Sequence, residues 1–108
     1  MSARVRFGAF ELDPHASRLT RDGEPVAISA EELEALVLLV ERSGGVVSRD
    51  ELFRKVWPGT FVRGRAMARL ARSLRAALGD DPAFPRFVAT VPRRGYRFIA
   101  QIEQLEEQ

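Results

Sequence analysis

Cysteine is absent from the 108-residue sequence, and histidine occurs once, as His15. Without cysteine the chain can form no disulfide, offers no thiolate nucleophile and lacks the usual zinc-finger ligands. His15 follows an Asp-Pro pair typical of a turn, so we expect a surface residue rather than a metal ligand. No nucleophile–base pair and no glycine-rich phosphate loop is visible. We therefore expect a protein that is not an enzyme and needs no metal, cofactor or small-molecule substrate.

Long apolar runs are missing as well. The longest, Ala35–Val40, is far shorter than the roughly 20 residues that a bilayer-spanning helix needs. The N-terminus lacks the apolar centre of a signal peptide. Hydrophobic residues make up 45% of the chain, which is ordinary for a globular protein. The expectation is one cytoplasmic domain with a modest core and no membrane segment within these residues.

Acidic residues are scarce in one part of the chain only. Residues 61–97 contain nine arginines but only two acidic residues, Asp80 and Asp81, whereas residues 1–60 contain eight basic and ten acidic residues. The positive charge is therefore local, although the net charge is only +2, and it indicates an anionic partner at one site. Asp80 and Asp81 precede a proline and have no third ligand nearby, so we interpret them as turn residues rather than a metal pair.

The helix predicted over 63–79 contains no acidic residue. At 100° per residue its three leucines share one face, Arg65, Arg69 and Arg72 lie opposite, and Arg75 lies at the edge. A cationic face lacks the support that oppositely charged residues four apart give each other. A nucleic acid would explain this face, and so would a solvated arginine-rich surface.

A capping side chain is also missing where this helix should begin, near Arg63 or Gly64. The two helices before it each start with a capping box, Ser29 to Glu32 and Ser48 to Glu51. We therefore expect a frayed first turn in the third helix.

The order of elements predicts an α+β winged helix-turn-helix fold. The Asp22-Gly23 pair indicates a tight hairpin in an N-terminal sheet, and Val46–Val47 is expected to be only an extended link. We expect one domain over 1–100, followed by a tail or linker over 101–108. Within the domain we expect a four-stranded antiparallel platform sheet over about 5–28, helices over about 30–43, 49–57 and 65–78, and a β-hairpin wing over about 86–100.

The wing has a basic tip, Pro92-Arg93-Arg94-Gly95. A cationic helix fits the major groove of a DNA duplex, and a basic hairpin beside it can reach the backbone phosphates or the minor groove. Together, the two elements predict that the chain binds double-stranded DNA.

Several motifs resemble one family across roughly residues 5–100. They are Phe7-Gly8 with Phe10 and Leu12-Asp13-Pro14; Ser48-Arg49-Asp50-Glu51-Leu52; Val56-Trp57-Pro58-Gly59-Thr60-Phe61-Val62; Leu74-Arg75 with Ala77-Leu78-Gly79-Asp80-Asp81; and Thr90 to Ala100. The chain resembles the winged-helix DNA-binding domain of OmpR/PhoB-type response regulators, and particularly CadC/ToxR-like one-component regulators. No receiver domain precedes the platform strands, so control by an aspartyl phosphate within this chain is not expected.

The resemblance implies a recognition helix that starts near Arg65. It implies base or phosphate contacts by Arg65, Arg72 and Arg75, wing contacts by Thr90, Arg93, Arg94 and Tyr96, and phosphate contacts by Arg49 and Trp57. The charge pattern adds Arg69 to the recognition helix, and it adds Arg63 and Arg97 to the candidates for phosphate contact. For Trp57, covering the core is an equally good interpretation. The loop of Pro58, Gly59, Thr60 and Phe61 resembles one that meets RNA polymerase, and family members commonly bind DNA as head-to-tail pairs.

The chain also departs from the family pattern. Arg63-Gly64 replaces the usual capping pair, and Ala68 and Leu70 replace polar residues. Base reading relies on arginine, amide or acidic groups, and this helix offers arginine and little else. We therefore expect more phosphate contact than sequence discrimination. The alternative is a winged-helix interaction module that docks on RNA polymerase or a sigma factor with weak or no sequence-specific DNA binding.

Overall fold

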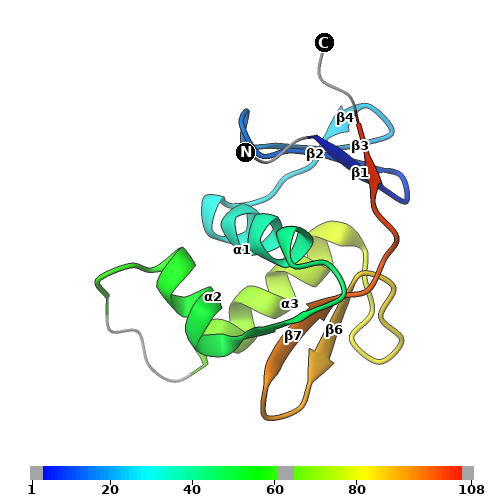
Figure 1. Ribbon diagram of the computed structural model, residues 1–108. Coiled ribbons are helices and arrows are strands. Elements are labelled where there is room, and N and C mark those ends of the chain that lie inside the picture. Colours follow the sequence, from blue (N-terminus) through cyan, green and yellow to red (C-terminus); the bar gives the residue numbers. More distant parts are fainter. Residues whose placement is uncertain (1–3, 61–64, 106–108) are drawn as a thin grey trace.

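A computed structural model describes residues 4–60 and 65–105 of the chain (Figure 1). Four short antiparallel strands come first, as predicted: β1 (Val5–Phe7), β2 (Phe10–Asp13), β3 (Arg18–Arg21) and β4 (Glu24–Pro25). Asp22 and Gly23 have φ angles of 51° and 83°, as a two-residue turn with both central residues left-handed requires. This confirms the predicted hairpin between β3 and β4.

The platform sheet has a fifth strand that the sequence did not reveal. β8 (Glu103–Gln104) pairs antiparallel with β1, which gives the strand order β4-β3-β2-β1-β8. The backbone amide of Leu105 also donates to the carbonyl of Arg4 over 2.9 Å. The expectation of a tail or linker over 101–108 was therefore wrong for these residues. The free edge of β1 binds them, and Ile102 packs against the core.

Three helices follow close to their predicted bounds: α1 (Ala30–Glu41), α2 (Arg49–Val56) and α3 (Ala66–Leu78). Both predicted capping boxes are present. The Ser29 and Ser48 hydroxyls accept from the amides of Glu32 and Glu51, and the two carboxylates accept from the serine amides in return. These local bonds fix where α1 and α2 begin.

The wing belongs to a three-stranded sheet of order β5-β7-β6, made of β5 (Val46–Ser48), β6 (Val88–Val91) and β7 (Gly95–Phe98). The Val46–Val47 segment is thus a paired strand and not merely a link, because the long-range partner β7 supplies its hydrogen bonds. Gly95 is needed at this contact, since a Cβ there would lie 2.0 Å from the Val47 carbonyl oxygen.

One apolar core joins both sheets to the helices. Phe7, Phe10, Phe87 and Phe98 form a cluster of ring contacts between the platform and the wing sheet, with centroids 5.0–5.7 Å apart. Figure 1 shows the platform on one side of α1 and the β6–β7 hairpin beside α3 on the other. No helix within the described parts of the chain is long and apolar enough to cross a membrane.

Candidate nucleic-acid interface

The two faces of α3 are separated in the structure as the sequence predicted. Its buried residues include the three leucines, Met67 and Ala71, which pack into the core. The exposed residues around the start and along the outer face are Arg65, Ala68, Arg69, Arg72, Ser73 and Ala76. Alternation of arginine with small residues leaves the helix backbone open to close approach by a large partner.

The start of α3 carries positive charge and no side-chain cap. Its N-cap residue is Arg65, one or two residues later than predicted, and no side chain among the described residues caps the first amides. The first turn also contains no acidic residue. The free amides and the helix dipole therefore add to the positive potential of the arginines. Arg63 lies outside the described residues.

The exposed arginines of α3 and the wing tip are not neutralised by carboxylates in the part of the chain that the structure describes. The ion pairs found there involve Arg4, Arg6, Arg42 and Lys55, which lie on the platform, the α1 end and α2. By contrast, no carboxylate of residues 4–60 or 65–105 lies within 4.0 Å of the charged groups of Arg65, Arg69, Arg72, Arg93 or Arg94. Their charge is available to an external anion.

Arg75 is buried, unlike these exposed arginines, although helix periodicity predicted it at the edge of the same face. Only 7% of its surface is exposed. Its Nε donates to the Val88 carbonyl over 3.1 Å, its Nη2 donates to Thr90 Oγ1 over 2.7 Å, and its guanidinium lies 5.8 Å from the centre of the Tyr96 ring. Helix periodicity alone could not show this, because the wing that covers Arg75 is distant in sequence.

The wing tip projects Arg93 and Arg94 into solvent. Arg93 has a φ of 66°, and the amide of Arg94 closes the turn on the Val91 carbonyl over 3.0 Å. Tyr96, for which the resemblance implied a DNA contact, is buried in the core, and its ring lies beside the Arg75 guanidinium. Arg97 is half-buried, and its Nε has no hydrogen-bond partner among the described residues.

A groove lies between α3 and the strands of the wing. It has a volume of about 470 Å³ and is lined by Ala68, Ala71, Arg72, Arg75, Ala76, Asp80, Pro82, Thr90 and Tyr96. In Figure 1 the β6–β7 hairpin lies alongside α3, and its tip extends beyond the helix. Of the exposed arginines, Arg72 lines this groove. We call the exposed arginines of α3 and the wing tip together the arginine surface: Arg65, Arg69, Arg72, Arg93 and Arg94.

Trp57 and Arg49 lie at opposite ends of α2. The Trp57 ring packs against Phe53 at 5.2 Å and joins the edge of the core, in agreement with the core-covering interpretation. Arg49 is exposed at the first position of the helix. Pro58, Gly59 and Thr60 are exposed beyond Trp57, whereas Phe61 lies outside the described residues.

Asp80 shapes the approach to the wing. One of its carboxylate oxygens accepts from the amide of Arg86, and the other accepts from the amides of Phe87 and Val88, over 2.7–3.2 Å. Asp81 accepts from the amide of Ala83. Both therefore act as turn residues, as the Gly-Asp-Asp-Pro sequence indicated. The described residues contain no group of three or more potential metal ligands.

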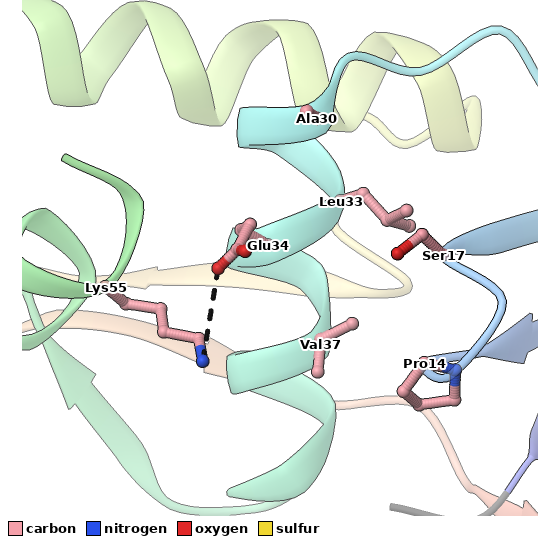
Figure 2. A pocket seen from close by; sticks show the side chains of 7 residues that line it. All are labelled: Pro14, Ser17, Ala30, Leu33, Glu34, Val37 and Lys55. Carbon is pink, nitrogen blue, oxygen red and sulfur yellow. Dashed lines mark ion pairs between the residues drawn. The ribbon is translucent and has the colours of Figure 1, made fainter. Parts of the chain in front are cut away.

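A second hollow, of about 220 Å³, lies between α1 and the turn after β2 (Figure 2). Leu33 and Val37 of α1 face Pro14 and Ser17 across it, and the Lys55 ammonium lies 4.0 Å from the carboxylate of Glu34. None of its lining residues belongs to α3 or the wing. Local sequence patterns do not predict this hollow, because residues far apart in the chain form it.

Residues 23–98 match a family model described as Transcriptional regulatory protein, C terminal. The chain is 32% identical over 99 residues to the transcriptional activator CadC of Escherichia coli, covering 91% of this chain and 19% of that protein. It is 35% identical over 104 residues to the cholera toxin transcriptional activator of Vibrio cholerae, covering 92% of this chain and 35% of that protein. The chain thus spans only about a fifth to a third of these relatives.

Two solved structures share the fold over most of the chain. The DNA-binding domain of E. coli CadC has a TM-score of 0.79 and 30% identity, covering 96% of this chain and 98% of that one. The Klebsiella pneumoniae RstA DNA-binding domain, solved in complex with the RstA box, has a TM-score of 0.78 and 28% identity, covering 89% and 96%.

Proposed function

This chain belongs to the family described as Transcriptional regulatory protein, C terminal, and we propose that it binds double-stranded DNA in the regulation of transcription. The single observation that carries the proposal is the arginine surface, whose five exposed arginines form no ion pair with a carboxylate among the described residues and lie on α3 and the tip of the wing. The earlier resemblance to OmpR/PhoB-type winged-helix domains is confirmed by this membership. The proposal implies that the domain acts in the cytoplasm.

In this proposal α3 enters the major groove. A helix of 13 residues is about 20 Å long, and the major groove is about 12 Å wide. Arg65 and Arg69 are four residues apart, so they lie on neighbouring turns of the same face. Arginine reads guanine edges or binds phosphate, and alanine contacts thymine methyl groups. Without an exposed amide or carboxylate reader on α3, binding is semi-specific and dominated by phosphate contacts.

The wing tip binds beside α3. Arg93 and Arg94 reach the phosphate backbone or the adjacent minor groove, where inserted arginines are favoured by the negative potential. Arg49, at the first position of α2, and the half-buried Arg97 are further candidates for phosphate contact. Pairs of such domains arranged head to tail would double the contacted surface on one duplex.

Removal of two arginines from α3 tests the proposal. We expect Arg69→Ala/Arg72→Ala to weaken binding to a random-sequence duplex at least about tenfold, and to lower the slope of log affinity against log salt by about 2. Fluorescence anisotropy across a salt series measures both quantities.

The matched control is Arg18→Ala/Arg21→Ala, which removes the same charge from β3 on the platform. We expect it to bind within about threefold of the unaltered chain at matched salt. Equal losses in the two double variants would show that net charge alone, and not the arginine surface, attracts DNA.

An interaction module that docks on RNA polymerase or a sigma factor is the second candidate. The uncapped start of α3 and its lack of amide or acidic readers favour it. The exposed Pro58, Gly59 and Thr60 offer a loop for such a contact. Selection of bound sequences from a random duplex pool separates the two: an enriched motif supports DNA reading, whereas no enrichment together with tight polymerase binding supports docking.

A further inference from the structure

Arg75 makes a set of contacts that links α3 to both strands of the wing hairpin. Its two hydrogen bonds reach Val88 and Thr90 of β6, and its guanidinium lies over Tyr96 of β7. The chain separates Arg75 from these partners by 13 to 21 residues, so the contacts fix a tertiary arrangement and not a local turn. Val88 is held from two sides, because its amide donates to Asp80 while its carbonyl accepts from Arg75.

The chemistry of this contact suits arginine in particular. A planar guanidinium offers several donors in a fixed fork, so one side chain can bind a carbonyl and a hydroxyl at once. The partners are neutral oxygens, and Asp80 directs its carboxylate to backbone amides instead. Burial of a charge without a carboxylate is costly, and a buried apolar side chain would be a cheaper way to stabilise the fold. The contact therefore points to a role in the placement of the wing.

We propose that Arg75 is a positioning residue that sets the wing relative to α3, so that Arg93 and Arg94 meet the same duplex as Arg69 and Arg72. This rests on the proposed DNA binding. It replaces the expectation that Arg75 itself contacts DNA, since its donors bind the wing and only 7% of its surface is exposed. Its effect on affinity passes through the wing-tip arginines.

A double-variant cycle tests whether Arg75 affects affinity through Arg93 and Arg94. Arg75→Met keeps an unbranched apolar stem but removes the donors and the charge, and it should weaken duplex binding about tenfold in the unaltered chain. In a chain that already carries Arg93→Ala/Arg94→Ala, the same change should cost less than about threefold, because the contacts that Arg75 places are gone. Equal losses in both backgrounds, with the salt slope falling by about 1 each time, would mean that Arg75 binds a phosphate itself and would overturn the proposal.

A measurement without DNA checks the positioning directly. The absence of cysteine allows two spin labels to be attached at Ser73→Cys on α3 and Ala89→Cys on β6. We expect one narrow distance in the labelled chain and a broader or displaced distribution after Arg75→Met. Thr90→Val, which removes only the hydroxyl acceptor, should broaden the distribution in the same direction and serves if Arg75→Met does not fold. An unchanged distance in a folded Arg75→Met chain would contradict the proposal.

The two proposals fail in different ways. If the chain does not bind DNA, the unaltered chain will show no affinity for a duplex, but the spin-label distances will still report on Arg75. If only the positioning role fails, the chain still binds DNA, and Arg75→Met causes the same loss of affinity with and without Arg93→Ala/Arg94→Ala.

Discussion

At the scale of one residue, Arg93 combines a strained backbone conformation with a positive charge at the wing tip. It is one of three non-glycine residues with positive φ among the described parts of the chain, at 66°. A left-handed conformation at a residue with a Cβ costs of the order of 1 kcal/mol, and sites that tolerate such strain are often functional. At this position the strained residue is an exposed arginine at the tip of the wing.

Arg93→Gly should separate the two effects. Glycine adopts the positive φ without strain, so we expect the free energy of unfolding to rise by up to about 1 kcal/mol while affinity for duplex DNA falls severalfold. Urea unfolding and anisotropy titration measure the two. Arg94→Gly, next to it but without the left-handed backbone, is the control, and it should lose affinity with no gain in stability. A gain in stability from both variants would rule out strain at Arg93.

At the scale of elements, local signals predicted the helices well and the strands less well. Both capping boxes lie within four consecutive residues, so the sequence alone located the starts of α1 and α2. β5 and β8 were missed because their hydrogen bonds come from β7 and β1, far away in the chain. For the same reason the exposed arginines of α3 were predictable from periodicity, whereas the burial of Arg75 depends on a wing that periodicity cannot place.

The contact between Arg42 at the end of α1 and Glu51 of α2 makes the free energy of unfolding depend on pH. Arg42 hydrogen-bonds Glu51 and, with the backbone amide of Ser48, lowers the pKa of that carboxyl below its usual value. A lowered folded-state pKa gives stability that is present above the unfolded-state pKa and is lost as the pH falls through the folded-state pKa. Glu51→Gln keeps an acceptor for Ser48 but removes the charge. We therefore expect its free energy of unfolding to fall less steeply on acidification.

Urea unfolding between about pH 7 and pH 3 measures this slope. Glu24→Gln, on exposed β4, removes one carboxylate without an Arg42 contact and is the control. Parallel acid profiles for Glu51→Gln and the unaltered chain would contradict the prediction.

At the scale of the whole molecule, the platform strands lie on one side of α1 and the β6–β7 hairpin on the other (Figure 1). Removal of β8 should therefore affect stability and not DNA binding. A chain that ends at Gln101 loses two residue pairs with β1, the Arg6–Glu103 ion pair and the packing of Ile102. We expect the free energy of unfolding to fall by about 1–3 kcal/mol and duplex affinity to stay within about threefold.

The shortened chain also lacks the acidic residues at 103, 106 and 107, so its net charge is more positive. The matched comparison is the full chain with glutamine at those three positions. If the shortened chain binds DNA more than about tenfold less tightly than this control, β8 supports the arginine surface and the separation of the two sides is wrong.

The pairing of β8 with β1 brings Arg4 and Leu105 to within one hydrogen bond of each other. A domain whose ends meet can be spliced into a surface loop of a host protein, or closed into a ring by a short peptide, with little distortion of its strands. Here the splice would lie at the β1–β8 edge of the platform, across α1 from the β6–β7 hairpin (Figure 1).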